Sequence, residues 1–236
     1  GDGWVIDGEK FVVLNGEAAD TLVVTARTKG GQTDRDGIGV FLVPRDAKGV
    51  TVKGYPTQDG MRAADITFTG VEVGADAAIG DSAAGLPLIE RVVDEARTAL
   101  CAEAVGAMDE SLKITVEYIK TRKQFGVPIG SFQALQHRAA DMFVFTEQAR
   151  SMAMLATMAS DFKDAKERAA SVAAAKVQVG KSSKFVGQQS IQLHGGIGMT
   201  MEASIGHYFK RLSIIESTFG DTDYHLRRAS ETGGII

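Results

Sequence analysis

The feature that most constrains the fold of this chain is a change of hydrophobic period near residue 75. Before it, short runs rich in β-branched and aromatic residues alternate with turn residues, as in "GWVI", "EKFVVL" and "TLVVTAR". After it, apolar residues recur at steps of three and four. Because side chains repeat every two residues in a strand and every 3.6 in a helix, the two parts require different secondary structure. We expect an α+β protein, with a partial antiparallel β-domain over residues 1–75 and an up-and-down four-helix bundle over residues 76–236.

Turn residues predict how the β-domain is divided. Asp7-Gly8 stands between two apolar runs, and such a pair favours the left-handed torsions of a tight hairpin. Asn15-Gly16 marks a second break. The polar, glycine-rich stretch "TKGGQTDRDG" predicts a loop over residues 28–37.

The helical part is predicted to begin with a long helix that ends near Arg122. Its buried stripe is expected to consist of apolar residues three or four positions apart: Ile89, Val92, Val93, Ala96, Leu100, Ala107, Met108 and Leu112. Residues 125–130 must break this helix, because they contain two glycines and a proline.

Four further helices are expected after this break. Ser131 is a candidate N-cap for the second helix, and Asp164 for a third that runs to Gly195-Gly196. A fourth helix is expected over residues 202–217 and a short fifth one after Gly220.

Composition and charge exclude several classes of function. The chain has 26 Lys and Arg against 30 Asp and Glu, a formal net charge of -4, so it lacks the basic excess that favours nucleic acid or an anionic membrane. Cys101, its single cysteine, can neither close an internal disulfide nor complete a zinc site. Four scattered histidines, each expected at the surface or at a helix cap, predict no metal site. No apolar run approaches the roughly 20 residues of a membrane-spanning helix. No signal peptide opens the sequence, so we expect a cytoplasmic protein without a membrane span.

Two polar, glycine-bearing connections are candidates for ligand binding. In the first, Arg122 stands beside Phe125, and Gln133 follows one turn into the next helix. This set could hold a phosphate and stack a planar ring, although Arg122 could equally compensate the end of its own helix. The second connection, "HGGIG", lets a ligand approach the backbone closely, and its alternative is an ordinary glycine cap.

The two connections together resemble the acyl-CoA dehydrogenase family of flavoproteins. "TRKQFGVPIGSFQALQHRAADM" and "QLHGGIGMTMEASIGHYFKR" are similar to two motifs of that family, in the same order and at the same separation. The upstream "GWVIDGEKFVVLNGEAADTLVVTAR" resembles the family's central β-domain. The resemblance implies the family's type of helical bundle. It also implies that the family's N-terminal helical domain, and the first part of its β-domain, precede anything present in this chain.

The resemblance implies FAD as cofactor, shared between subunits of a homodimer, homotetramer or heterotetramer. The implied FAD-binding residues are Arg122, Gln124, Phe125, Gln133, Gln192, Leu193, His194, Gly195, Gly196, Asp221, Thr222 and Asp223. The implied acyl-CoA contacts are Asp94, Glu95, Ala96, Arg97 and Gly220.

The catalytic base of the family has no direct counterpart in this sequence. The family's usual glutamate position, twenty-one residues after the last glycine of the Gly-Gly-x-Gly turn, is Phe219, and its alternative position, before Arg97, is Ala96. Glu95 is one residue away from that alternative position, which on a helix is a rotation of about 100°. Asp221 and Glu216 are therefore the candidate bases. In the β-domain, Val12 and Leu14 replace a flavin-packing tryptophan and a threonine.

The activity implied by the resemblance is α,β-dehydrogenation of an acyl-CoA thioester, with electrons passing to an electron-transferring flavoprotein. The end of the chain resembles a bacterial subgroup that includes small subunits of heteromeric enzymes, pimeloyl-CoA dehydrogenase among them. The absent glutamate therefore leaves open a non-catalytic, FAD-sharing subunit. A flavin oxidase on the same fold is also left open.

Overall fold

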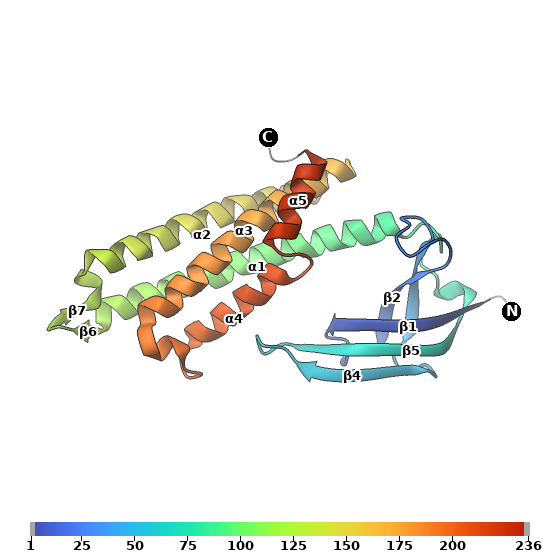
Figure 1. Ribbon diagram of the computed structural model, residues 1–236, viewed down its shortest axis with the longest axis horizontal. Helices are drawn as coiled ribbons and strands as arrows, with labels where there is room; N and C mark the ends of the chain where they lie inside the picture. Colours follow the sequence, from blue (N-terminus) through green and yellow to red (C-terminus); the bar gives the residue numbers. More distant parts are fainter. Residues whose placement is uncertain (1–2, 234–236) are drawn as a thin grey trace. The chain divides into compact units, whose positions relative to one another are not determined.

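The computed structural model describes residues 3–233, and Figure 1 shows its long strands in the first part of the chain and its long helices in the second. The chain divides into two compact units, residues 1–91 and 92–236, and the division falls within the long helix α1 (Leu86–Thr121). The predicted α+β composition is confirmed. The predicted domain boundary after residue 75 stays a prediction.

The first unit consists of two small antiparallel sheets. One has the order β1-β5-β4, with β1 at Gly3–Leu14, β5 at Arg62–Gly74 and β4 at Val50–Pro56. The other pairs β2 (Thr21–Arg27) with β3 (Ile38–Pro44). Alternate residues of both sheets form one apolar core, with these buried members: Ile6, Leu22, Val24, Phe41, Val43, Ala64, Ile66, Phe68 and Val71. A short 3-10 turn, η1 (Ala75–Ala77), follows β5.

The predicted hairpin at Asp7-Gly8 is wrong, because β1 continues through these two residues. The pairing of β1 with β5 shifts register between Ile6 and Gly8, so the pair forms a bulge and not a turn. The Asp7 carboxylate accepts a hydrogen bond from the Gly70 backbone N–H at 2.6 Å. Pairing along the whole of β5 therefore outweighs the local turn preference. The loop predicted over residues 28–37 is confirmed, and Arg27 donates to four of its backbone carbonyls.

The second unit is a helical bundle, as predicted. After α1 come α2 (Gln133–Ala159), α3 (Ala165–His194), α4 (Ser204–Ser217) and the short α5 (Thr222–Thr232). In Figure 1, α1, α2 and α3 run side by side along the bundle, and α5 lies beside α3 near the C-terminus. The shared core combines residues from four helices, among them Cys101, Met108, Met142, Val186 and Leu212. The fourth helix starts at Ser204, two residues later than predicted.

One of the two predicted helix caps is confirmed and the other is wrong. The Asp164 carboxylate accepts hydrogen bonds from the backbone N–H groups of Lys166 and Glu167 at 2.7 and 3.0 Å, as an N-cap should. Ser131 instead donates its hydroxyl to the Pro128 carbonyl at 2.7 Å. It ends a 3-10 turn, η2 (Ile129–Ser131), and this turn places Phe132 at the N-cap position of α2.

The predicted apolar stripe of α1 is wrong in its first half. Val92 is exposed, whereas Asp94, Arg97 and Thr98 are buried. These polar side chains find charged and hydrogen-bonding partners inside the unit, as described below, so their burial does not need an apolar pattern. From Cys101 onward the buried positions are small or apolar and include the predicted Ala107 and Met108.

Candidate cofactor and substrate sites

The connection between α1 and α2 is an exposed miniature hairpin. Arg122 directly follows α1. The short strands β6 (Lys123–Gln124) and β7 (Val127–Pro128) pair with each other. The turn between them consists of Phe125 and Gly126, both in left-handed backbone conformation. The Phe125 ring is 89% exposed. Within residues 3–233 the Arg122 guanidinium makes no hydrogen bond or ion pair, so it is available to an external anion. A free guanidinium beside an exposed ring suits a phosphorylated, aromatic ligand.

Two other predicted residues of this connection are also exposed. Gln133 is the first residue of α2, and Gln124 donates its side-chain amide only to the adjacent Lys123 carbonyl at 2.8 Å. Phe125 meets Phe132 edge to face, with ring centroids 6.0 Å apart. This contact stiffens the hairpin without covering it.

The glycine-rich segment after α3 forms the second candidate site. Gly195 has a φ of 63° and ends α3, and residues Gly195–Met199 form the 3-10 turn η3. A Cβ added at Gly195 or Gly196 would meet no atom within 4 Å, so the backbone here is open to a ligand. Gln192 is exposed, whereas Leu193 is buried and can contribute only its backbone.

The structure brings these two candidate sites to the same end of the bundle. His194 is buried, its Nδ1 lies 2.8 Å from the Ser190 carbonyl, and its ring stacks on Tyr118 with centroids 4.4 Å apart. Tyr118 lies one helical turn before Arg122, and its carbonyl accepts the Arg122 backbone N–H at 2.8 Å. We call this region the hairpin end. It comprises Arg122, Gln124, Phe125, Gln133 and Gln192–Gly196.

The predicted acyl-CoA contacts near the start of α1 belong to a buried charge cluster. Asp94 is 1% exposed, and Arg97 donates to it at 2.9 Å. Arg228 of α5 lies 3.0 Å from the same carboxylate and Arg168 of α3 lies 3.8 Å from it. One aspartate thus faces three arginines from three helices, and the cluster ties α1, α3 and α5 together.

The neighbouring predicted residues lie away from this cluster. Ala96 is only partly buried, and Glu95 is exposed, which agrees with the rotation expected one residue along the helix.

Arg97 also reaches the connection between α4 and α5. Its Nε donates to the Phe219 carbonyl at 2.9 Å, and its guanidinium carbon lies 5.7 Å from the centre of the Tyr224 ring. Phe219 and Gly220 follow each other with φ of 55° and 107°. Together Asp94, Arg97 and residues 216–223 form a second region, which we call the turn end.

Both candidate bases at the turn end are engaged in the fold. One oxygen of Glu216 accepts from the backbone N–H and the hydroxyl of Thr222, at 2.9 and 2.8 Å. Asp221 is the N-cap of α5 and accepts the Tyr224 N–H at 2.7 Å. Asp223 is exposed in the first turn of α5. Whether Glu216 or Asp221 abstracts a proton stays a prediction.

The hairpin end and the turn end are far apart within one chain. Arg97 and the last residue of α1, Thr121, are separated by 24 residues of one helix (121 − 97), which at 1.5 Å per residue is about 36 Å. This distance exceeds the length of an FAD molecule. The predicted FAD-binding residues therefore fall into two groups that one cofactor cannot bridge within a single chain.

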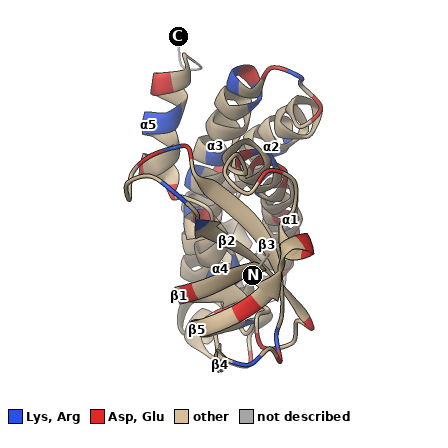
Figure 2. Cartoon of the chain, turned by 90° about the vertical axis from the view of Figure 1, so that its right-hand side faces the viewer, with Lys and Arg blue, Asp and Glu red and all other residues tan. Residues whose placement is uncertain are grey.

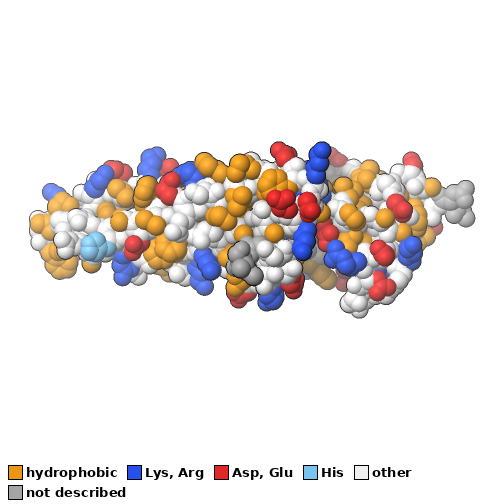
Figure 3. Space-filling view, turned by 90° about the horizontal axis from the view of Figure 1, so that it is seen from above, with side chains coloured by type: hydrophobic (Ala, Val, Ile, Leu, Met, Phe, Trp, Pro, Cys, Tyr) orange, Lys and Arg blue, Asp and Glu red, His pale blue; other side chains and the backbone are white. Residues whose placement is uncertain are grey.

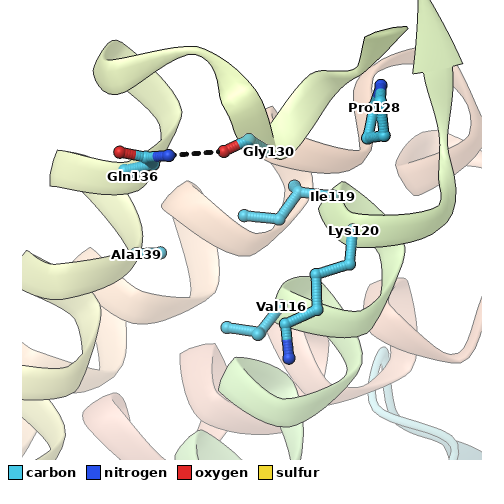
Figure 4. A pocket seen from close by; sticks show the side chains of 7 residues that line it. All are labelled: Val116, Ile119, Lys120, Pro128, Gly130, Gln136 and Ala139. Carbon is cyan, nitrogen blue, oxygen red and sulfur yellow. Dashed lines mark hydrogen bonds between the residues drawn. The ribbon is translucent and has the colours of Figure 1, made fainter.

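A pocket of about 400 Å³ lies between the last turns of α1 and the first turns of α2. Figure 4 shows its lining, which is apolar apart from Lys120 and Gln136 and consists of Val116, Ile119, Lys120, Pro128, Gly130, Gln136 and Ala139. The Gln136 amide donates to the Gly130 carbonyl at 2.8 Å. No predicted site residue lines this pocket, although Pro128, Gly130, Gln136 and Ala139 belong to the motif of residues 121–142.

Three buried titratable groups near the turn end were missed by sequence reasoning. Burial, together with the nearby Lys176 charge, lowers the pKa of His225 to about 4. Burial also lowers the pKa of Lys176 and raises the pKa of the Cys101 thiol to about 11. The expectation that every histidine lies at the surface or at a cap is wrong for His225, which is fully buried.

In the first unit, the two positions that differ from the family's flavin-packing pair lie on β1. Val12 has a φ of 53° within a second register shift of β1, and its N–H donates to Asp65 at 3.1 Å. Val12 and Leu14 are both exposed. Neither side chain offers the flat ring or the hydroxyl of the residues it replaces.

Other classes of site are not found among residues 3–233. No group of three or more metal-ligating side chains is present there, and no helix there is long and apolar enough to cross a membrane. Figure 2 shows basic and acidic residues interspersed over the face in view.

Comparison with protein families identifies both parts of the chain. Residues 83–233 match the acyl-CoA dehydrogenase C-terminal domain, and residues 1–71 match the acyl-CoA dehydrogenase middle domain. The protein described as "Probable acyl-CoA dehydrogenase YngJ" of Bacillus subtilis (strain 168) is 32% identical over 226 residues, which cover 94% of this chain and 59% of YngJ.

Solved structures give the same result. A variant of the Tcur3481-Tcur3483 steroid ACAD is 33% identical with a TM-score of 0.84, and the match covers 98% of this chain and 60% of that one. A chain in the structure described as the electron transferring flavoprotein of Acidaminococcus fermentans is 27% identical with a TM-score of 0.90, covering 100% of this chain and 62% of that one. These likenesses confirm the predicted fold. The chain spans about three fifths of each of these relatives.

Proposed function

Because the chain belongs to the acyl-CoA dehydrogenase family, we propose that it forms part of an FAD-dependent enzyme that introduces an α,β double bond into an acyl-CoA thioester. The observation that carries this proposal is the hairpin end. There an unpaired guanidinium, an exposed ring and an open glycine backbone lie on adjoining elements. These groups suit the pyrophosphate and the flat rings of FAD.

Each residue of the hairpin end would bind a different part of FAD. Arg122 would pair with the pyrophosphate, since its planar fork matches two phosphate oxygens at once. Gly195 and Gly196 would let the cofactor approach the main chain, and Phe125 would supply an apolar wall. Gln124, Gln133 and Gln192 are exposed amides that could bind the polar edges of the cofactor.

The separation of the two ends argues for an assembly of subunits. Since one FAD cannot reach both the hairpin end and the turn end of one chain, we propose that the hairpin end of one subunit completes the site at the turn end of another. Figure 3 shows patches of apolar side chains between the charged ones on the face in view. Among the exposed apolar residues of the bundle are Phe143, Met154, Met158, Met199 and Met201. A homodimer, homotetramer or heterotetramer would cover such residues.

At the turn end, we propose that Arg97 and Gly220 contact the acyl-CoA. A bound FAD would supply the acceptor for the hydride from the substrate β-carbon, and an electron-transferring flavoprotein would receive the electrons. The protein must remove the α-proton and stabilise the charge that develops on the thioester oxygen. The buried cluster around Asp94 holds Arg97, so the contact offered to the substrate is preorganised.

Two observations favour a second candidate, a non-catalytic subunit that shares FAD with an active partner. One carboxylate oxygen of Glu216 and one of Asp221 accept backbone N–H groups of α5, so both side chains already serve the fold. The name Tcur3481-Tcur3483 joins two proteins. The resemblance proposed from the sequence, to small subunits of heteromeric enzymes such as pimeloyl-CoA dehydrogenase, agrees with this second candidate.

The test uses the complete protein, purified with its FAD and mixed anaerobically with butyryl-CoA, palmitoyl-CoA and pimeloyl-CoA. Bleaching of the flavin absorbance by this protein alone would support the dehydrogenase. If bleaching requires a co-purified second subunit, the non-catalytic candidate is supported. A protein that never retains FAD, alone or with a partner, would contradict both.

Two variants sharpen this test. Glu216→Gln and Asp221→Asn keep the size of each side chain but remove the carboxylate. Loss of bleaching in one of them, with FAD retained, would identify the base. Bleaching that survives both substitutions would exclude both residues.

A further inference from the structure

The connection between α4 and α5 has an unusual backbone that the surrounding structure must hold. Phe219 has a left-handed conformation that is rare for a residue with a Cβ, and Gly220 follows with another positive φ. A Cβ on Gly220 would collide with the ring of Tyr224. Two consecutive residues in such conformations persist only where neighbouring groups over-determine them.

Lys176 of α3 supplies part of this restraint from inside the bundle. Its side chain is 1% exposed, and its Nζ donates to the carbonyls of Ile215, Glu216 and Gly220 at 2.6, 3.0 and 3.3 Å. All three protons of the ammonium group are thus used. Two of the acceptors belong to the last turn of α4, where carbonyls lack helical partners and carry the negative end of the helix dipole.

The protonated form of Lys176 is the one that fits this arrangement. Burial lowers the pKa of the amine, but a neutral amine has only two N–H donors and would leave one carbonyl without a partner. The carbonyl of Gly220, which has the longest of the three contacts, would be released first. The ammonium therefore links the end of α4 to the second residue of the strained pair.

The adjacent carbonyl, that of Phe219, is held by residues of two other helices. The Phe219 carbonyl accepts from Arg97 Nε at 2.9 Å and lies 3.1 Å from His225 Nε2. Two successive peptide carbonyls thus point inward to cations or donors on α3, α1 and α5. With both carbonyls inward, the Phe219 side chain points outward and is 41% exposed.

We propose that Lys176 is a positioning residue, which holds the Phe219–Gly220 turn in the conformation that meets the acyl-CoA. This role rests on the proposed function, in which Gly220 contacts the substrate. Lys176 itself touches no substrate. It acts through the carbonyl of Gly220 and through the end of α4.

The first test compares Lys176→Met with wild type in the complete holoenzyme. Methionine has a similar length and no donor, so we expect the dissociation constant of butyryl-CoA, followed by flavin absorbance, to rise about tenfold. Hydrogen exchange of the amides of residues 217–222 should accelerate, while exchange in residues 122–130 stays unchanged. Lys181→Met, at an exposed lysine of the same helix, should match wild type in both measurements.

A milder variant covers the case in which Lys176→Met does not fold. Lys176→Gln keeps an amide with two donors, and we expect a rise of about threefold in the dissociation constant. Faster exchange at residues 217–222 with unchanged butyryl-CoA binding in either variant would overturn the positioning role, since Lys176 would then support only the fold.

Wild type alone gives a test that needs no variant. Saturation with butyryl-CoA should slow exchange at residues 217–222, and the absence of any slowing would overturn the proposal. If FAD-loaded wild type binds no acyl-CoA at all, the proposed function fails and the role of Lys176 fails with it. This result can be distinguished from a failure of the Lys176 role alone, because it would be seen in the unmodified protein.

Discussion

The hairpin end and the turn end of the bundle use their polar groups in opposite ways. At the hairpin end, the Arg122 guanidinium has no partner within the described residues and Phe125 is almost fully exposed. At the turn end, Asp94 is buried, and so is Lys176, which binds this region from α3; each has several partners from other helices. The polar groups of the hairpin end are free to bind a ligand, whereas most polar side chains of the turn end already bind other parts of the protein.

This difference separates two kinds of predicted site residue. A residue whose side chain is free can be removed at little cost to stability, and its loss should appear in ligand binding. Removal of a side chain that binds other parts of the protein should lower the stability first. The predictions below test this contrast in order of decreasing effect.

The largest effect is expected from Asp94→Asn. The substitution leaves Arg97, Arg168 and Arg228 without their buried counter-charge, and breaking a buried ion pair in this way typically costs about 3 to 5 kcal/mol. Chemical denaturation followed by circular dichroism measures it. The control is Asp109→Asn, which breaks a half-exposed pair with Arg150 and should cost less than about 1 kcal/mol. Equal losses of stability in Asp94→Asn and Asp109→Asn would show that the buried ion pairs of Asp94 do not stabilise the turn end.

A pH effect is expected from His225. Its folded-state pKa of about 4 lies below the ordinary 6.5, so between these values the unfolded chain binds a proton that the folded chain does not. Stability should therefore be unaffected above pH 6.5 and fall by about 2 to 3 kcal/mol as the pH drops to 4.

The variant His225→Gln isolates the contribution of His225 to the pH dependence of stability. It keeps an N–H donor for the Phe219 carbonyl but does not titrate, so the unfolding free energy should depend less steeply on pH between 6.5 and 4. His137→Gln, at an exposed position of α2, should leave the slope as in wild type. If the unfolding free energies of wild type, His225→Gln and His137→Gln depended equally on pH, the lowered pKa of His225 would be contradicted.

Arg122→Ala should show the opposite behaviour. A charge-assisted hydrogen bond to phosphate contributes about 1.5 to 3 kcal/mol, so FAD affinity should fall roughly ten- to a hundredfold. The stability of the apoprotein should change by less than about 0.5 kcal/mol, because the side chain is exposed. FAD retained through dialysis gives the first quantity and denaturation the second. Wild-type retention of FAD would remove Arg122 from the cofactor site.

The smallest effect is expected at Asp221. Asp221→Ala removes the N-cap of α5 and should cost about 1 kcal/mol, whereas Asp221→Asn keeps a capping oxygen and should cost only a few tenths. Thermal unfolding of the two variants measures the difference. Equal stability would indicate that the carboxylate is not committed to the cap and could serve the substrate instead.

Local sequence predicted the elements whose causes are local. Asp164 was predicted as a cap because its partners are the next two or three residues, and the break after Arg122 because Gly126 and Pro128 act at their own positions. Ser131 was misassigned because its hydroxyl turns back to Pro128, a choice between two local partners that the sequence does not decide.

The contacts within the turn end escaped prediction because they join residues that are distant in sequence. Lys176 meets the Ile215 carbonyl 39 residues later, and Arg97 meets Phe219 122 residues later. Asp94 and Arg97 interrupt the apolar pattern, so that pattern placed the buried stripe of α1 on other residues. A buried polar side chain leaves no periodic signal, since its burial depends on a partner and not on its own hydrophobicity.

By itself, the sequence determined that a β-rich part is followed by a helical one, where the main breaks occur, and which two glycine-bearing connections resemble flavoprotein motifs. Only the tertiary structure decided that these two connections share one end of the bundle, and that Asp221, Glu216 and Arg97 are engaged at the other. The physical reason is that helix and strand periods depend on neighbouring residues, whereas the free or committed state of a side chain depends on groups brought together by folding.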